Sequence, residues 1–156
     1  MMSYNFEKSN LGPLINKAVV EITPLVEAKG IQLESDVGRD LPIVNLDRER
    51  ILQVLRNLIG NAVKFTPTAG QVKVAARTLD GHVEVSVRDT GPGVPKENLE
   101  TIFDKFQQGK RKGAFASNGT GLGLAMAKHI IVSHGGSIWA ENHPEHGSTF
   151  IFVLPS

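Results

Sequence analysis

The chain has 156 residues, of which 40% are hydrophobic and 21% charged, and its formal net charge at pH 7 is +1. This size predicts one domain, residues 1–156, and the near-zero charge gives no field that would attract nucleic acid or a membrane surface. The absence of cysteine excludes a disulfide framework, a thiolate metal site and a cysteine nucleophile. With neither a membrane-length apolar run nor a signal-peptide pattern, we expect a soluble, cytoplasmic domain.

The first quarter of the chain predicts a helix followed by a short strand. Asn10 is a suitable N-cap and Gly30 a suitable stop for a helix from about Leu11 to Lys29. Pro24 lies inside this pattern and predicts a kink or a later start of the helix. A loose alternation of apolar and polar residues from 31 to 35 predicts the strand.

A second helix is predicted from Asp47, its N-cap, to Thr66-Pro67, which ends it. Its apolar residues recur every three or four positions and so share one buried face. These residues are Ile51, Val54, Leu55, Leu58, Ile59 and Ala62.

The second half of the chain predicts a hairpin, a short helix, a mobile loop, another helix and two closing strands. Asp80-Gly81 joins the two hairpin strands, because a type I′ turn needs positive φ at both positions. Strands and helices are grouped rather than alternating, which favours an α+β two-layer sandwich over a doubly wound sheet. Phe103, Phe106 and Trp139 are expected in the core. The predicted segments are 71–79 and 82–88, 95–103, 107–118, 123–133, 137–141 and 149–154.

Polar residues of the second helix form the first candidate site. Asn57, Asn61 and Lys64 lie at i, i+4 and i+7 and therefore share one stripe beside the apolar face. An amide oxygen can bind a Mg²⁺ that keeps several waters and takes other ligands from phosphate, and a lysine one turn later can meet a phosphate. The alternative is a solvated polar edge of the helix.

Asp89 ends a valine-rich strand and precedes Thr90-Gly91-Pro92-Gly93. A carboxylate held against apolar walls can accept a hydrogen bond from an exocyclic amine, a donor that adenine offers at N6. Gly91 and Gly93 would let the backbone come close to a flat ring. The alternative is ordinary turn chemistry after a strand.

A glycine-rich stretch, Gly119-Thr120-Gly121-Leu122-Gly123-Leu124, opens the third long helix. It lacks the features of a P-loop or a dinucleotide fingerprint, and its backbone N–H groups form a natural phosphate seat or a hinge for a lid. The segment before it is basic, which suits a lid over a triphosphate or a solvated charge run. The cations of this segment are Lys105, Lys110, Arg111 and Lys112.

The five histidines of the chain lack the spacing of metal ligands and are interpreted as structural or surface residues. They are His82, His129, His134, His143 and His146.

The four stretches 57–64, 89–93, 103–106 and 119–124, in this order, resemble the N, G1, F and G2 boxes of the catalytic, ATP-binding domain of bacterial sensor histidine kinases. That domain belongs to the superfamily of gyrase, chaperone, histidine kinase and MutL ATPases. Residues 29–31, 47–66 and 135–154 are also similar to it. The resemblance implies a Bergerat-type sandwich, with about three helices on one face of a mixed, mostly antiparallel sheet, and an ATP lid.

The resemblance also implies roles for individual residues. Asn61 matches the Mg²⁺ ligand, Asn57 and Lys64 the phosphate-side residues, and Asp89 the residue that reads adenine, with Gly91 and Gly93 as its supporting turn. The stretch Gly119, Thr120, Gly121, Leu122 and Gly123 matches the phosphate-cradling end of the lid. Asn57, Lys64 and Lys105 are the expected catalytic residues, and Lys105 is the first choice for the γ-phosphate.

Three departures from the family pattern concern the chemistry. Phe65 stands where tyrosine is frequent, and Gln108 stands where some members have arginine. No histidine lies in a phosphoacceptor box. The resemblance implies a kinase module, monomeric by itself, that transfers the γ-phosphoryl of Mg-ATP to a histidine on a helical dimerisation domain of a parent kinase and acts indirectly on a response regulator. The parent is either cytoplasmic or membrane-anchored, while this domain makes no membrane contact.

Two other classes remain as alternatives. Water-directed ATPases of the gyrase kind carry a glutamate as general base four residues before the metal-binding asparagine. Asn57 occupies that position here and cannot take up a proton at neutral pH. The other alternative is a non-catalytic ATP sensor, against which the four intact boxes argue.

Overall fold

The structure is a computed structural model that describes residues 3–104 and 122–156. Three helices and two sheets make up the described chain. The helices are α1 (Leu11–Lys29), α2 (Arg48–Phe65) and α3 (Leu122–Ser133), with a 3₁₀ turn, η1, at Lys96–Asn98. The strands are β1 (Glu7–Ser9), β2 (Gln32–Val37), β3 (Val44–Leu46), β4 (Gln71–Leu79), β5 (His82–Asp89), β6 (Ser137–Asn142) and β7 (Ser148–Pro155).

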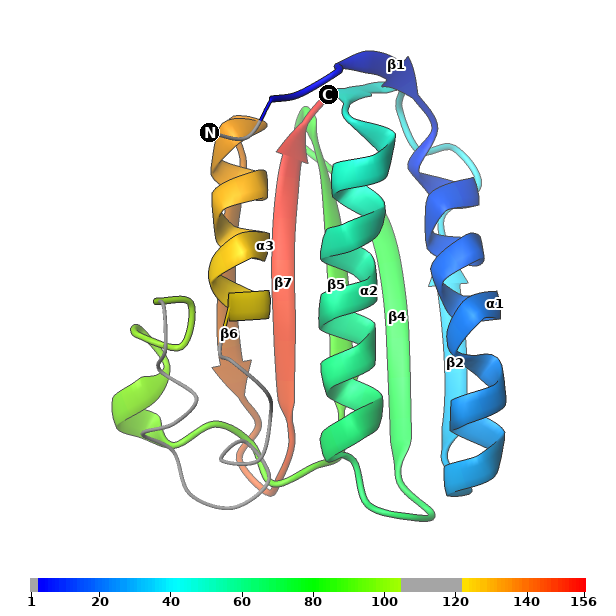
Figure 1. Cartoon of the computed structure of the whole chain (residues 1–156), viewed down its shortest axis with the longest axis vertical. Coiled ribbons are helices and arrows are strands. Elements are labelled where there is room, and N and C mark those ends of the chain that lie inside the picture. Colours follow the sequence, from blue (N-terminus) through cyan, green and yellow to red (C-terminus); the bar gives the residue numbers. More distant parts are fainter. Residues whose placement is uncertain (1–2, 105–121) are drawn as a thin grey trace.

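The main sheet has five strands in the order β2-β4-β5-β7-β6. Only β2 and β4 run parallel, and the other three pairs are antiparallel. All three helices lie on the same face of this sheet, with α2 between α1 and α3 (Figure 1). The expected α+β sandwich with a mixed, mostly antiparallel sheet is therefore confirmed.

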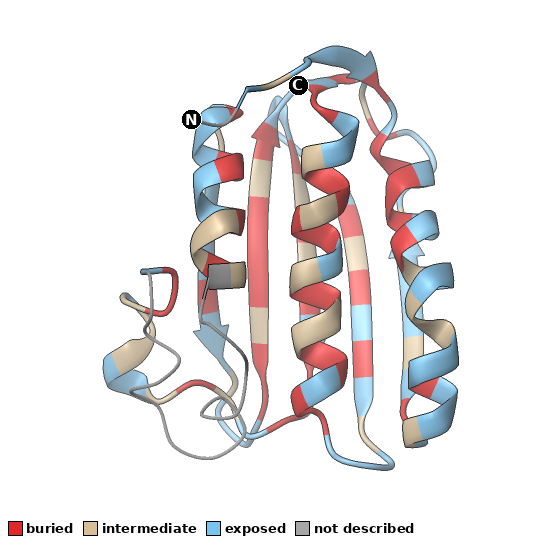
Figure 2. Ribbon diagram, in the orientation of Figure 1, coloured by how far each residue is buried: buried red, intermediate tan, exposed pale blue. Residues whose placement is uncertain are grey.

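The core lies between the helix layer and the sheet. Buried positions alternate along β4 and β5 and recur on the inner stripe of each helix, while in β7 Ile151 on the opposite face is buried as well (Figure 2). This pattern follows from the two periodicities, since every second strand residue and every third or fourth helix residue faces the partner layer. The predicted apolar face of α2 is buried from Ile51 to Ala62. The buried face of this helix therefore fixes where its polar stripe lies beside the sheet.

The predicted helix ends are confirmed. The Asn10 side chain accepts from the Gly12 N–H at 2.9 Å, and Gly30 adopts φ +74° at the C-cap of α1. Asp47 caps α2 by accepting from the Arg50 N–H at 3.1 Å. Because α1 is continuous from its cap through Pro24, the later start is wrong.

The short β1–β3 sheet was not predicted, because each strand has only three residues, too few to show an alternation. The helix predicted over 95–103 is wrong: only η1 and turns form there. Trp139 is also not a core residue; its side of β6 faces away from the helices and it is 36% exposed. None of the helices that the structure describes is both long and apolar enough to cross a bilayer.

His134 has the structural role expected of it. Its Nε2 accepts from the Asp47 N–H at 3.0 Å, and its Nδ1 pairs with the Ile130 carbonyl at 2.7 Å. Burial lowers the pKa of the His134 imidazole, so the ring is held in the neutral form that accepts at Nε2. The ring thereby connects the end of α3 to the start of α2.

Candidate nucleotide-binding site

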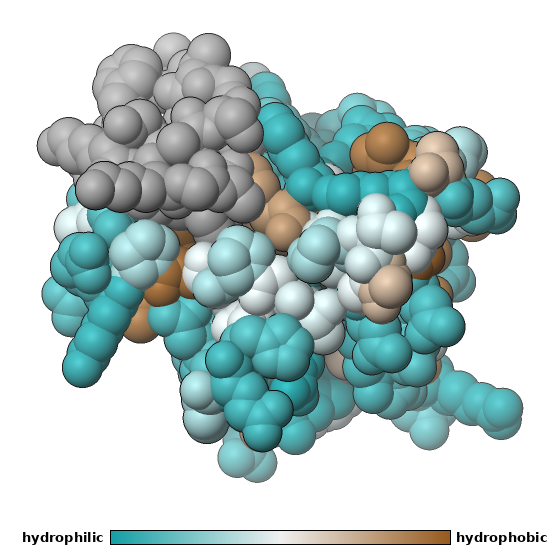
Figure 3. Space-filling view, turned by 90° about the horizontal axis from the view of Figure 1, so that it is seen from below, coloured by the Kyte–Doolittle hydropathy of each residue, from teal (hydrophilic) through white to brown (hydrophobic). Residues whose placement is uncertain are grey.

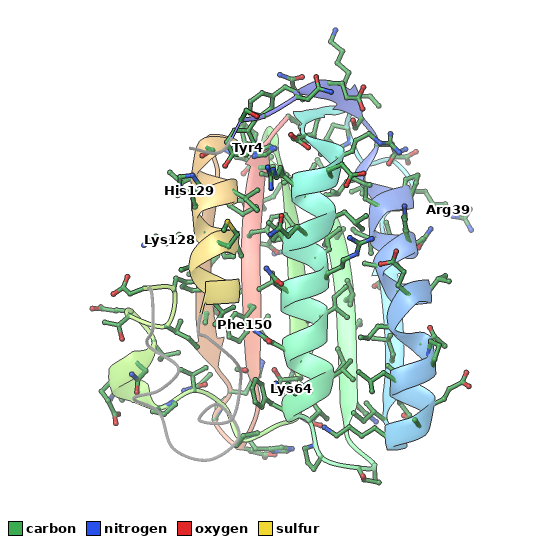
Figure 4. All side chains as sticks on the ribbon, in the orientation of Figure 1. Tyr4, Arg39, Lys64, Lys128, His129 and Phe150 are labelled. Carbon is green, nitrogen blue, oxygen red and sulfur yellow. The ribbon has the colours of Figure 1, made fainter. Side chains whose placement is uncertain are left out.

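The candidate site lies at the end of the sandwich where α2 and β5 both terminate. Figure 4 places Lys64 at this end of α2 and Phe150 on the neighbouring β7. Viewed from this end, the described surface is mostly hydrophilic, with small apolar patches (Figure 3). A small pocket here is lined by Asn61, Ala62, Phe65, Asp89, Pro92, Gly93 and Phe150. Two of the four stretches singled out in the sequence therefore meet in one pocket.

Asp89 is the buried charged group of this pocket, with 7% of its surface exposed. Its Oδ1 accepts from the Gly91 N–H at 2.9 Å, and its Oδ2 accepts from the Ser148 hydroxyl at 3.0 Å. Burial raises the pKa of the Asp89 carboxyl, and the two hydrogen bonds oppose that rise. The carboxylate is thus fixed in orientation and able to accept one further hydrogen bond from a ligand.

The glycines after Asp89 are required by close packing against α2. A Cβ on Gly91 would lie 2.9 Å from the Phe65 carbonyl oxygen and 3.1 Å from Oδ1 of Asp89. Gly93 has φ +82°, and a Cβ there would lie 3.1 Å from Oδ1 of Asn142. The absence of side chains at these two positions therefore lets the turn pack closely against the end of α2 and against β6. Their predicted approach to a flat ring stays a prediction.

Two supporting residues of the site were missed in the sequence. Ser148 holds Asp89 from the start of β7, across 59 positions of the chain. The Asn142 side chain pairs with both backbone groups of Val94, donating at 2.6 Å and accepting at 2.9 Å. Each contact is long-range and uses a common residue type, so no local pattern signals it.

The polar stripe of α2 reaches two parts of the site. Asn61 lines the pocket that contains Asp89, and the Asn57 amide donates to the Gly123 carbonyl in the first turn of α3 at 3.1 Å. The Lys64 ammonium lies 5.8 Å from the centroid of the Phe65 ring. The stripe thus connects the pocket of Asp89 with the start of α3, where helix N–H groups can receive a phosphate.

The C-terminal end of α2 is stabilised from outside the stripe. The Lys29 ammonium donates to the carbonyls of Val63, at 2.9 Å, and Lys64. Burial lowers the pKa of Lys29, but the charged ammonium suits the negative end of the helix dipole. This contact fixes the helix end that carries Asn61.

Phe103, the first aromatic of its stretch, is buried as expected and contacts Phe150 edge to face, with ring centroids 6.0 Å apart. The segment 107–118, predicted as a mobile loop and lid, lies outside the described residues. The same holds for Lys105, Phe106, Gly119, Thr120, Gly121 and the side chain of Leu122. Their expected roles stay predictions. The structure thus brings together Asn57 with Gly123 and Asn61 with Asp89.

The donor set at Asn61 fits a magnesium ion that arrives with a phosphate ligand. Within the described ranges, no group of three His, Cys, Asp or Glu side chains could hold a metal by itself. A single neutral amide oxygen suits Mg²⁺, which keeps waters and takes charge from substrate phosphates. Asn61 would therefore hold the ion only together with a nucleotide.

Gly147→Ala is expected to destabilise the fold beyond the cost of its backbone angle. Gly147 has φ +91°, and a Cβ there would lie 2.2 Å from the Asp89 carbonyl oxygen. Gly81 provides the matched control, with φ +78° and nothing within 4 Å. We expect Gly81→Ala to cost about 1–2 kcal/mol and Gly147→Ala roughly 3 kcal/mol or more in urea unfolding. Equal losses would show that the strand relaxes around the added methyl group.

Comparison with known proteins identifies the family. The sequence profile described as histidine kinase-, DNA gyrase B-, and HSP90-like ATPase matches residues 46–156. The adaptive-response sensory kinase SasA of Nostoc sp. strain PCC 7120 is 39% identical over 151 residues, which cover 96% of this chain and 37% of SasA. The chain thus spans little more than a third of this relative.

Solved histidine kinase structures have the same fold. The catalytic domain of ThkA in a nucleotide-free form has a TM-score of 0.85 at 36% identity, covering 97% of this chain and 95% of that one. Full-length ShkA in complex with AMPPNP has a TM-score of 0.85 at 32% identity, and the match covers 99% of this chain and 32% of ShkA. ThkA in complex with the response regulator protein TrrA has a TM-score of 0.78 at 34% identity, and the match covers 96% of this chain and 41% of that one.

These matches show the family and the fold of the chain. The family profile covers more than half of the chain, and the ThkA domain matches it over nearly the full length of both. The Bergerat-type fold expected from the four boxes is confirmed. The chain therefore belongs to the family of histidine kinase-, DNA gyrase B- and HSP90-like ATPases, with the fold of a histidine kinase catalytic domain.

Proposed function

We propose that this chain binds Mg-ATP and transfers its γ-phosphoryl group to a histidine on a separate helical domain in two-component signal transduction. The observation that carries the proposal is the buried, oriented carboxylate of Asp89 in one pocket with Asn61. Transfer of label from γ-labelled ATP to a histidine-bearing helical domain is the experiment that tests it.

In this proposal the pocket of Asp89 selects the base. Its carboxylate accepts from the adenine N6 amine, whereas guanine has a carbonyl oxygen at the corresponding position. The apolar walls supplied by Ala62, Phe65 and Phe150 exclude water around that hydrogen bond and strengthen it. The two donors that already hold the carboxylate keep it from turning away.

The phosphates lie, in this proposal, between the polar stripe of α2 and the start of α3. Asn61 would hold Mg²⁺, which supplies positive charge to the phosphate oxygens. Asn57 positions the first turn of α3 through Gly123, and Lys64 and Lys105 supply cations. The chain thus contributes positioning and charge stabilisation rather than a protein nucleophile, as is usual in phosphoryl transfer.

The names of the relatives support the finer parts of the proposal. SasA is named a sensory kinase, ShkA was solved with AMPPNP, and ThkA was solved with a response regulator protein. We infer from them that the partners of this chain are a histidine-bearing dimerisation domain and, indirectly, a response regulator. Direct hydrolysis is the rival reaction, and Asn57 argues against it because an amide cannot activate water as a base.

Asn61→Ala is expected to remove the part of nucleotide affinity that depends on Mg²⁺. The base pocket retains Asp89, so affinity for ATP in EDTA should change less than twofold, while the enhancement by magnesium disappears. Calorimetric titration of an ATP analogue with and without Mg²⁺ measures the metal-free affinity and its enhancement by magnesium. Asn45→Ala, an exposed residue of β3, is the matched control. Equal losses in both conditions would make Asn61 a structural residue.

A further inference from the structure

The face of the main sheet opposite the helices is uncovered in the described part of the chain (Figure 1). The strand register places side chains of this outer face in rows across the sheet. One row is Glu34, Lys73, Arg88, Thr149 and Glu141, and the next is Asp36, Ala75, Ser86, Ile151 and Trp139. The nucleotide pocket uses none of these side chains.

Lys73 and Arg88 are directly opposite each other on the adjacent strands β4 and β5, close to the end of the sheet where β5 terminates. Like charges in such a cross-strand pair repel and destabilise the sheet. Among the described residues, neither cation forms an ion pair, although Glu34 is the register neighbour of Lys73. By contrast, Arg77 on the same face pairs with Glu84 at 2.9 Å. Within the described chain, Lys73 and Arg88 therefore lack an ion pair of the kind that compensates the charge of Arg77.

Both cations border a hollow of about 230 Å³. Its other lining residues are Glu34, Gln32, Gln71, Thr90 and Val72. Gln71 lies beside them, and its amide donates to the Gln32 side chain at 3.2 Å. A carboxylate entering this hollow would meet two cations directly. With two cations and one carboxylate in its lining, the hollow keeps a net positive charge, which favours an acidic side chain of a partner.

A second, wider depression of about 600 Å³ lies next to it on the same face. Its floor includes the small side chains of Ala75 and Ser86 together with Ile151, and Trp139 forms one side. The indole of Trp139 is held by a hydrogen bond from its Nε1 to Glu141 at 2.9 Å. A large, fixed aromatic residue that remains exposed is typical of the anchoring points of protein interfaces.

The part of this face that carries the two depressions has a size that suits a short segment rather than a folded partner. Rows 73 to 77 across five strands cover about 19 by 14 Å, or roughly 270 Å², from strand spacing and rise. A stable interface buries about 800 Å² on each partner. The acidic residues at both edges, Glu34, Asp36 and Glu141, would repel a ligand with negative charge spread along its length, such as nucleic acid.

We propose that the outer face of the sheet is a docking surface for an extended segment of a partner protein, in which an acidic residue enters between Lys73 and Arg88 and an apolar residue packs against Trp139. Arg88 and Trp139 are two strands and two residues apart, or about 12 Å from strand geometry. At about 3.4 Å per residue, the acidic and apolar residues of the segment are therefore four positions apart.

Trp139 gives a direct measurement, because it is the one tryptophan of the chain. The probes are synthetic ten-residue peptides with two adjacent glutamates and a leucine four positions away, in either order. Their counterparts carry lysine in place of glutamate. We expect saturable changes in Trp139 fluorescence with the glutamate peptides and at least tenfold weaker binding of the lysine peptides.

The double variant Lys73→Gln/Arg88→Gln should weaken binding of the glutamate peptide at least tenfold. The matched control, Arg77→Gln on the same face, should change it less than threefold. Both variants should keep the affinity for the ATP analogue, which separates this proposal from the proposed kinase function. The proposal is overturned if no glutamate peptide gives a saturable change, if the lysine peptides bind equally, or if equimolar inorganic phosphate displaces the peptide.

Discussion

Asp89→Asn is expected to lower the affinity of this chain for ATP at least tenfold. Asparagine keeps the size of the side chain but replaces one acceptor oxygen by an NH₂ donor, which repels the adenine N6 amine or the Ser148 hydroxyl hydrogen. A hydrogen bond to a charged group contributes about 1.5–3 kcal/mol, and about 1.4 kcal/mol corresponds to a factor of ten. The loss should therefore be large although the pocket keeps its shape.

Calorimetric titration with an ATP analogue measures the effect. Asp80→Asn, in the exposed hairpin turn, is the matched control, because asparagine tolerates the φ of +39° found there. Burial raises the pKa of Asp89, so wild-type affinity should fall as the pH is lowered through that pKa and the carboxylate becomes protonated. This part of the pH dependence should be absent from Asp89→Asn. Unchanged affinity in the variant would contradict the role given to Asp89.

Local chemistry explains which parts of the fold were predictable. The caps at Asn10, Gly30 and Asp47 and the turn at Asp80-Gly81 depend on a few neighbouring residues, and each was predicted correctly. The exposure of Trp139 depends instead on which face of the sheet the helices cover. An alternating strand leaves both faces open, and the large aromatic side chain favoured the wrong one.

The proximity of some candidate residues followed from the sequence, whereas the side chains that support them did not. The spacing of Asn57, Asn61 and Lys64 placed them on one stripe, and the pocket that joins Asn61 to Asp89 agrees with the proposed assignment. The holding of Asp89 by Ser148 could not be predicted, because β5 and β7 become neighbours only through the sheet topology. Gly91 was singled out for approach to a ligand, whereas its close neighbour is the end of α2.

The isolated chain is expected to bind Mg-ATP but to hydrolyse it very slowly and not to phosphorylate itself. Asn57 offers no base to activate water, and its amide is engaged with Gly123. None of the five histidines lies in a phosphoacceptor box, and His134 is buried at the end of α3 that is remote from Gly123. In the proposed reaction, the acceptor histidine therefore comes from another domain.

Transfer should appear only when a helical domain with a phosphoacceptor histidine is fused to the chain or added at high concentration. Fusion raises the effective concentration of a weakly binding partner to the millimolar range, so the fused protein should be labelled at least a hundredfold faster than the mixture at micromolar concentrations. Incubation with γ-labelled ATP, followed by acid treatment, measures acid-labile phosphohistidine.

Two controls separate transfer from contamination and from hydrolysis. The fused protein with its acceptor histidine changed to alanine should take up no label, and the fused protein with Asp89→Asn should take up little at low ATP. Phosphate release should stay slow in every variant, because removing the acceptor does not create a base at Asn57. Acid-labile label on the isolated chain, or fast phosphate release without a partner, would mean that the γ-phosphoryl goes to water or to this chain, and the proposed reaction would be wrong.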